Sequence, residues 1–97
     1  MSDYNNVNMM LKNIFSDSCY IEIICLLYER ELSATEISDL LNHDKNFIEN
    51  HLEALVQLNL VRKVQKNNND FFISSNPKVC DSIISLKDAL YNVVIQH

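Results

Sequence analysis

Several side chains between positions 45 and 51 could form directional hydrogen bonds with the bases and phosphates of a nucleic acid. The amides of Asn46 and Asn50 both donate and accept, so each could pair with the edge of an adenine. Lys45 could reach a phosphate or a guanine, and Glu49 could accept from the amine of a cytosine. The opposing interpretation of these residues is an ordinary solvated helix face.

The charge of this segment works against an anionic partner. From position 44 to position 55, Lys45 is set against Asp44, Glu49 and Glu53, which gives a net charge of -2. DNA would be repelled unless some of these acids are paired. Lys45 and Glu49 are four residues apart, the spacing at which an ion pair can form on a helix.

A second group of charges lies on a segment that alternates like a strand. Arg62, Lys63 and Lys66 are set against Asp70, which gives a net charge of +2. On a hairpin, such cations could contact the minor groove or the phosphates beside a binding site. An exposed edge strand also carries charges merely to prevent pairing with other strands. Both interpretations stay open.

The cysteines Cys19, Cys25 and Cys80 are odd in number, and no export signal is visible, so we expect a reducing, cytoplasmic location. Cys25 lies among isoleucines and leucines, where a cysteine usually serves as a small packing residue. Cys19 and Cys25 are about 240° apart around a helix and cannot bridge each other. The helix dipole could lower the pKa of Cys80, although half-buried packing is the simpler expectation.

The length and composition limit the classes of protein to which the chain can belong. A chain of 97 residues predicts one domain, residues 1–97, and 47% hydrophobic with 22% charged residues indicates a globular fold. The absence of glycine and the single proline favour helices over turn-rich β architectures. A net charge of -5 argues against a histone-like binder but permits a local basic patch. No apolar run reaches the ~18 residues of a membrane span, so we expect no membrane partner.

The first half of the chain predicts two helices. The first is indicated by apolar residues at helical spacing, namely Val7, Met10, Leu11 and Ile14. A break with capping residues at 16–18 follows. Residues 19–28 are then apolar at almost every position, which predicts a buried central helix.

Two shorter helices are predicted next. Ser33 and Glu36 form a capping box, Asn42 can adopt the left-handed conformation that ends a helix, and Asp44 can cap the following one. The expected inner face of the first is Ala34, Ile37, Leu40 and Leu41. The expected inner face of the second is Ile48, Leu52, Leu55 and Val56. The three-residue connection matches a helix-turn-helix.

The last third predicts a hairpin and a long helix. Residues 60–66 and 71–74 alternate like strands, and 67–70 form their turn because asparagine tolerates the positive φ usually supplied by glycine. Asn76 and Pro77 mark the start of the last helix. Its apolar residues form a narrow stripe, Val79, Ile83, Leu86, Leu90 and Val93.

The order of these elements predicts the fold class: mainly α with a small β-hairpin, a winged helix-turn-helix. The apolar faces of the first and last helices exceed what so small a core can cover. We therefore expect a homodimer that pairs through the terminal helices.

With this order of elements, the sequence resembles the ArsR/SmtB family of winged-helix repressors over about residues 12–91. The segments that carry the resemblance are 21–27, 31–37, His51-Leu52 with Leu55, Leu60-Val61 and Phe71-Phe72. The resemblance implies a dimeric transcriptional repressor whose helix 44–55 enters the major groove of double-stranded DNA. The residues that it places at the groove are Lys45, Asn46, Glu49 and Asn50, with His51 near the DNA backbone.

The stretch 21–36 is most similar to the HlyU-like subgroup, which responds to sulfur species or redox state and has a cysteine where Cys25 stands. That resemblance implies a thiol sensor at Cys25. The subgroup's second cysteine would fall near Tyr91 or Asn92. Cys80 lies about eleven residues earlier, on the order of 16 Å along a helix, so the subgroup's bridge does not carry over directly.

We expect no metal, no cofactor and no enzymatic activity. The family's thiolate site would fall at 33–35, where there is no cysteine, and along the last helix only Asp81 and Asp88 occur, with His97 at the terminus. No nucleophile-base pair or glycine-rich phosphate loop is present, so we expect no small-molecule substrate.

The alternative function is an interaction module or antirepressor that keeps the winged helix but no longer reads DNA. The acids at positions 44, 49 and 53 favour it.

Overall fold

The computed structural model describes the backbone of residues 2–95 and the side chains of residues 7–94. Its elements, in chain order, are α1 (Ser2–Ser16), α2 (Ser18–Leu26), α3 (Ala34–Leu41), α4 (Lys45–Gln57), β1 (Val61–Lys66), β2 (Asn69–Ser74) and α5 (Pro77–Ile95). This is the predicted order, and it is a winged helix-turn-helix. None of the helices within 2–95 is long and apolar enough to cross a membrane.

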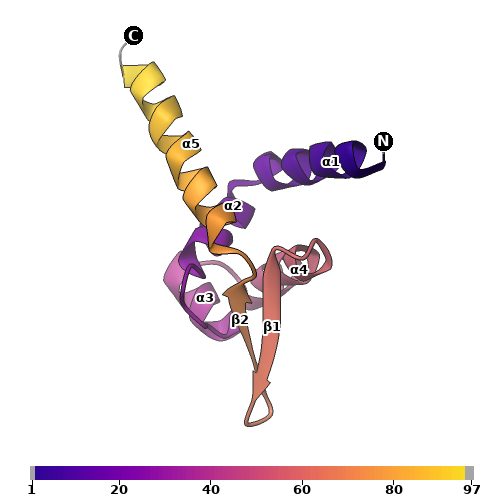
Figure 1. Ribbon diagram of the computed structural model, residues 1–97. Coiled ribbons are helices and arrows are strands. Elements are labelled where there is room, and N and C mark those ends of the chain that lie inside the picture. Colours follow the sequence, from indigo (N-terminus) through magenta and orange to yellow (C-terminus); the bar gives the residue numbers. More distant parts are fainter. Residues whose placement is uncertain (1, 96–97) are drawn as a thin grey trace.

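The core lies where α2, α3 and α4 meet the base of the hairpin (Figure 1). Its fully buried side chains are Ile23, Ile24, Leu27, Ile37, Ile48, Leu52, Leu55, Val61 and Cys80. Burying a large aliphatic side chain stabilises a fold by about 1.5–3 kcal/mol, so this cluster is the main source of stability. The cluster also fixes α4 against α2, which leaves the opposite side of α4 in solvent.

Local capping explains where α3 begins and ends and where α4 begins. The Glu36 N–H donates to Ser33 Oγ at 3.2 Å and the Ser33 N–H donates to Glu36 Oε1 at 2.9 Å, which is the predicted capping box. Asn42 has φ 57°, the predicted left-handed stop. Asp44 accepts from the Asn46 N–H at 3.1 Å and opens α4.

The hairpin is tighter than predicted. Lys66 pairs with Asn69, so the turn is the two residues Asn67 and Asn68 and not the four residues 67–70. Both have positive φ, 51° and 67°, as two-residue hairpin turns require. The strand pattern before Phe71 was too polar to reveal that β2 starts at position 69.

A single bridge attaches the loop before α3 to the hairpin. The Leu32 N–H donates to the Phe72 carbonyl at 3.0 Å and the Phe72 N–H donates back at 2.8 Å. Sequence patterns gave no sign of this contact. It ties the base of the hairpin to the start of α3.

Two predicted burial patterns were wrong in part. Leu40 is 57% exposed, although it was expected on the inner face of α3. Helix α2 ends at Leu26, earlier than expected, and buries only Cys19, Ile23 and Ile24, while its Glu22 is exposed. Both helices are short, with nine residues in α2 and eight in α3.

The terminal helices α1 and α5 leave the body in different directions (Figure 1). Within residues 7–94, the first turns of α5 pack on the core through Cys80 and Ile83, and α1 does so through Ile14. Farther out their apolar residues are exposed: Val7 is 50% exposed and Leu90 is 55% exposed. The protomer therefore leaves the predicted dimerisation stripe largely uncovered.

Candidate nucleic-acid interface

Helix α4 presents one polar face to solvent. Lys45, Asn46, Glu49 and Asn50 are all exposed, as the sequence predicted. They are exposed because Ile48, Leu52 and Leu55 anchor the opposite face in the core. The same geometry places Glu53 and Gln57 outside as well. The spacing of these two from Asn46, seven and eleven residues, could have indicated them.

The acids of α4 are not neutralised in the way the sequence suggested. The ion pairs formed within residues 7–94 join His51 to Asp17, Lys63 to Asp70 and Lys66 to Glu31. The expected pair between Lys45 and Glu49 is not among them. Both residues instead line a polar groove of about 550 Å³, which lies between the start of α3, the start of α4 and the hairpin tip.

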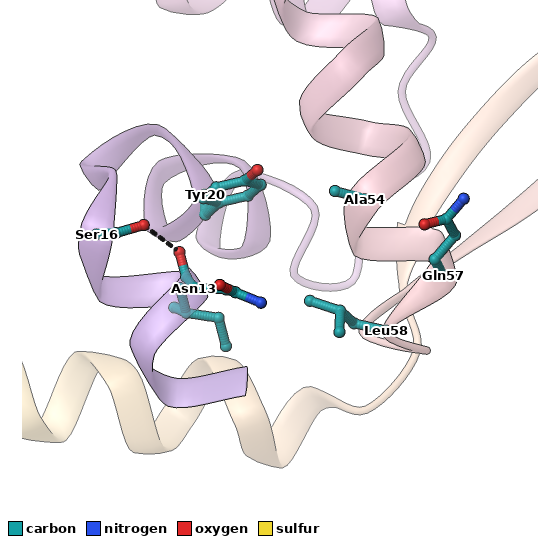
Figure 2. Close-up of a pocket in the computed structure, with 7 residues that line it drawn as sticks. Asn13, Ser16, Tyr20, Ala54, Gln57 and Leu58 are labelled. Carbon is teal, nitrogen blue, oxygen red and sulfur yellow. Dashed lines mark hydrogen bonds between the residues drawn. The ribbon is translucent and has the colours of Figure 1, made fainter. Parts of the chain in front are cut away.

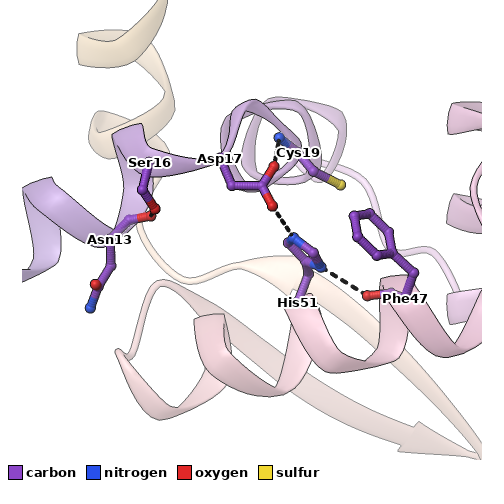
Figure 3. Close-up of polar contacts among 6 residues, drawn as sticks. All are labelled: Asn13, Ser16, Asp17, Cys19, Phe47 and His51. Carbon is purple, nitrogen blue, oxygen red and sulfur yellow. Dashed lines mark hydrogen bonds and ion pairs between the residues drawn. The ribbon is translucent and has the colours of Figure 1, made fainter.

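His51, which the resemblance placed near the DNA backbone, is largely buried within the protein. It is only 8% exposed, and both ring nitrogens are engaged inside the protein. Nδ1 lies 2.8 Å from the Phe47 carbonyl oxygen, and Nε2 lies 2.8 Å from Asp17 Oδ2 (Figure 3). The reason for the difference is tertiary, because the partner of His51 is 34 residues away in sequence.

Aromatic rings extend this contact along α4. The Phe47 ring lies 4.9 Å from the His43 ring and 4.3 Å from the His51 ring, measured between centroids. The Tyr20 ring of α2 lies 4.5 Å from the His51 ring. The row of rings links the start of α4 to the start of α2.

The hairpin carries the predicted cations, all exposed. Lys63 lies 4.0 Å from Asp70 and 5.9 Å from the centre of the Phe72 ring. Lys66 lies 2.6 Å from Glu31, a partner outside the hairpin. Exposed pairs of this kind are weak, so these lysines remain able to exchange their partners for phosphate.

The thiols of Cys25 and Cys80 interact, which the sequence did not indicate. Burial first, and then hydrogen bonding with the Cys25 thiol, raises the pKa of Cys80 to about 12. The pKa of Cys80 is therefore raised and not lowered, as the helix dipole alone could have done, and its burial is more complete than the half-buried packing that was expected. Cys80 is fully buried, whereas Cys25 is half-buried. All three cysteines are free thiols.

Two hollows lie beside these surfaces. A pocket of about 190 Å³ separates α1 from α2 and α4, and Figure 2 shows the Asn13, Tyr20 and Gln57 side chains that line it. A larger apolar hollow of about 340 Å³ lies between α1 and α5. It is lined by Leu11, Ile14, Phe15, Lys78, Val79, Ser82, Ile83 and Leu86. These residues include much of the predicted dimerisation stripe.

Within the described residues, no group of three or more histidine, cysteine, aspartate or glutamate side chains is arranged to hold a metal ion. Of the possible ligands Asp81, Asp88 and His97 in the last part of the chain, His97 lies outside the described residues.

The fold and this surface define a winged helix-turn-helix protein of the regulatory class. Residues 20–63 match the arsR family of bacterial regulatory proteins. This match, together with the solved structures described below, supports the resemblance of the chain to ArsR-type regulators close to HlyU.

Solved structures of other proteins share this fold. HlyU from Vibrio cholerae is 26% identical over 92% of this chain and 95% of its own, with a TM-score of 0.74. BigR from Xylella fastidiosa, a transcriptional repressor, is 22% identical over 95% of this chain and 86% of its own, with a TM-score of 0.69. Mb0332 from Mycobacterium bovis, a homodimeric winged helix-turn-helix DNA-binding domain, is 14% identical over 99% of this chain and 88% of its own, with a TM-score of 0.83. No curated protein matches the chain in sequence.

Proposed function

We propose that residues 1–97 form a single winged-helix domain that acts as a homodimeric transcriptional repressor in the cytoplasm. Two α4 helices enter successive major grooves of an inverted repeat, with half-sites about one helical turn apart. Asn46 and Asn50 read base edges, while Lys45, Arg62, Lys63 and Lys66 contact phosphate. The protein acts by binding DNA and carries out no catalysis.

The exposed polar face of α4 is the observation that carries this proposal. Its two amides stand one helical turn apart on the side away from the core, where they can reach a groove without unfolding anything. The hairpin adds cations beside this face. A footprint on the protein's own promoter tests the proposal directly. Protection of an inverted repeat supports it, and no protection even at low salt contradicts it.

The terminal helices support the homodimer. A stripe of apolar side chains on α1 and α5 is exposed in the protomer, and Mb0332, with the same fold, is homodimeric. Contiguous exposed apolar surface of this kind marks an interaction site. Leu90→Glu, on the exposed part of α5, is expected to give folded monomers by analytical ultracentrifugation and to weaken DNA binding. An unchanged dimer would contradict this interface, and Asn8→Ala on α1 is the control.

A thiol response at Cys25 and Cys80 is part of the proposal. Cys25, the more accessible of the two, is the thiol that meets a peroxide, which converts it to a sulfenic acid with release of water. The Cys80 thiol then displaces a second water and closes a disulfide. This bridge would join α2 to α5 and so alter the spacing of the two α4 helices.

Mass spectrometry of the peroxide-treated protein tests this step. We expect loss of two hydrogen masses and one linked peptide pair that contains Cys25 and Cys80. Cys80→Ala should prevent the link, while Cys19→Ala should leave it. Linkage that involves Cys19, or none at all, would contradict the assignment.

A second candidate function is favoured by the exposed acids of α4. Asp44, Glu49 and Glu53 all face solvent, which suits a protein partner better than DNA. In that case the chain is an interaction module or antirepressor. Salt dependence separates the two functions, since DNA affinity falls steeply with added salt.

A further inference from the structure

The contact between His51 and Asp17 decides the protonation state of a buried ring at the centre of the recognition helix. His51 projects from the middle of α4, and Asp17 is the residue that caps α2 (Figure 3). Each ring nitrogen has one partner, and both distances are 2.8 Å. The His51 side chain is 9% exposed and that of Asp17 is 40% exposed, so the ring itself is largely shielded from water.

Both partners of the ring are acceptors. The Phe47 carbonyl oxygen can only accept, so Nδ1 must carry a proton. A carboxylate oxygen can also only accept, so Nε2 must carry one as well. A neutral ring has a single N–H and would turn a lone pair toward one of these oxygens. Two satisfied contacts therefore require the imidazolium form.

Two hydrogen bonds hold Asp17 in its ionised form. Its other oxygen, Oδ1, accepts from the Cys19 N–H at 2.9 Å at the start of α2. The hydrogen bond with His51, followed by that from the Cys19 N–H, lowers the pKa of Asp17 below its ordinary value. A protonated carboxyl that donates to Nε2 is therefore disfavoured.

The other groups around the ring suit a cation. The Tyr20 ring of α2 and the Phe47 ring of α4 flank His51 at 4.5 Å and 4.3 Å, and aromatic faces attract positive charge. The ionisable groups facing it are Asp17, Tyr20 and, across the Phe47 ring, His43.

We infer that His51 is an imidazolium whose ion pair with Asp17 positions the recognition helix on α2, so that loss of its proton loosens α4 and weakens DNA binding. The final step rests on the proposed DNA-binding function, whereas the ion pair does not. His51 is a positioning residue in this scheme and contacts no DNA. Because the contact needs the charged ring, affinity falls as pH rises.

Asp17→Asn removes the negative charge of the carboxylate and leaves a side chain of the same size. The asparagine oxygen can still accept from the Cys19 N–H and cap α2. Its amide nitrogen can donate to Nε2 of a neutral ring that keeps the Nδ1 proton for Phe47. The variant therefore keeps each hydrogen bond but no longer requires the imidazolium.

Nitrogen-15 NMR of the ring in the free protein tests the ion pair. At about pH 7, we expect both ring nitrogens of His51 to resonate as protonated in the natural protein. In Asp17→Asn, Nε2 is expected to resonate as unprotonated while Nδ1 stays protonated. An unprotonated Nε2 in the natural protein, or identical spectra in both, would overturn the inference.

The affinity for the promoter fragment, followed between about pH 6 and about pH 8, tests the consequence. The natural protein should lose affinity with rising pH, by up to about tenfold per pH unit for each coupled His51 and so by up to about a hundredfold for a dimer. Asp17→Asn should have a clearly flatter profile. Parallel profiles would overturn the positioning role. If neither protein binds DNA, the proposed function fails, and the NMR result still decides the ion pair.

Discussion

Helix α4 and the β1–β2 hairpin present opposite charge on neighbouring surfaces. Helix α4 exposes the Asn46 and Asn50 amides beside the acids Glu49 and Glu53, whereas the hairpin exposes three cations against one acid. A phosphate backbone attracts the hairpin and repels the acids of α4. The difference indicates a division of labour, in which the hairpin supplies affinity and α4 supplies selectivity.

Removal of both amides should have the largest effect on this division. Asn46→Ala with Asn50→Ala is expected to weaken binding to the promoter site by about 1–3 kcal/mol for each amide. Binding to unrelated DNA should hardly change, because the amides do not contact phosphate in this scheme. Fluorescence anisotropy with both duplexes measures the ratio, and Asn8→Ala serves as the control. Equal losses on both duplexes would contradict base reading by α4.

Reversal of the charge at Glu49 should reduce the difference in charge between α4 and the hairpin. Glu49→Arg is expected to raise affinity for any duplex by on the order of tenfold, since an acid near phosphate becomes a cation. Titration at two salt concentrations measures this gain. An unchanged affinity would place Glu49 away from the DNA, and a loss would show that its carboxylate makes a required contact.

Neutralisation of the hairpin should weaken binding to every sequence alike. Arg62→Ala and Lys63→Ala are each expected to reduce the slope of log affinity against log salt by about 0.9. Lys66→Ala should have a smaller effect, because Glu31 already occupies its ammonium group. A change in sequence preference, with the salt slope unaltered, would show that the hairpin reads bases.

The smallest expected effect is on stability in acid. The pKa of Asp17 is lowered from 3.8 by its hydrogen bonds to His51 and Cys19. A lowered pKa in the folded state adds stability that is present above 3.8 and is lost as pH falls through the folded value. The free energy of unfolding should therefore differ between the natural protein and Asp17→Asn near neutral pH, and the difference should shrink in acid. Denaturant titrations measure it, with the exposed Asp39→Asn as a control whose difference stays small throughout.

Features that depend on near neighbours were predictable from the sequence. The capping box of Ser33 and Glu36, the stop at Asn42 and the cap at Asp44 each involve residues at most three positions apart. The exposure of Asn46 and Asn50 followed from helical periodicity alone. These predictions succeeded because hydrogen bonds over one turn and burial on one face need no knowledge of distant segments.

Contacts between distant segments were not predictable. The His51 ring contacts Asp17, which lies 34 residues away in the sequence. Burial and the nearby Cys25 thiol raise the pKa of Cys80. The Lys66–Glu31 pair and the bridge from Leu32 to Phe72 are of the same kind.

The sequence alone determined the order of the helices and strands, the positions of their caps and the polar face of α4, because these depend on residue type and spacing. Only the tertiary structure decided which buried polar groups and thiols meet, since such pairs are created when α2, α4 and α5 pack together. No local pattern in the sequence indicates the distances between the residues of such pairs.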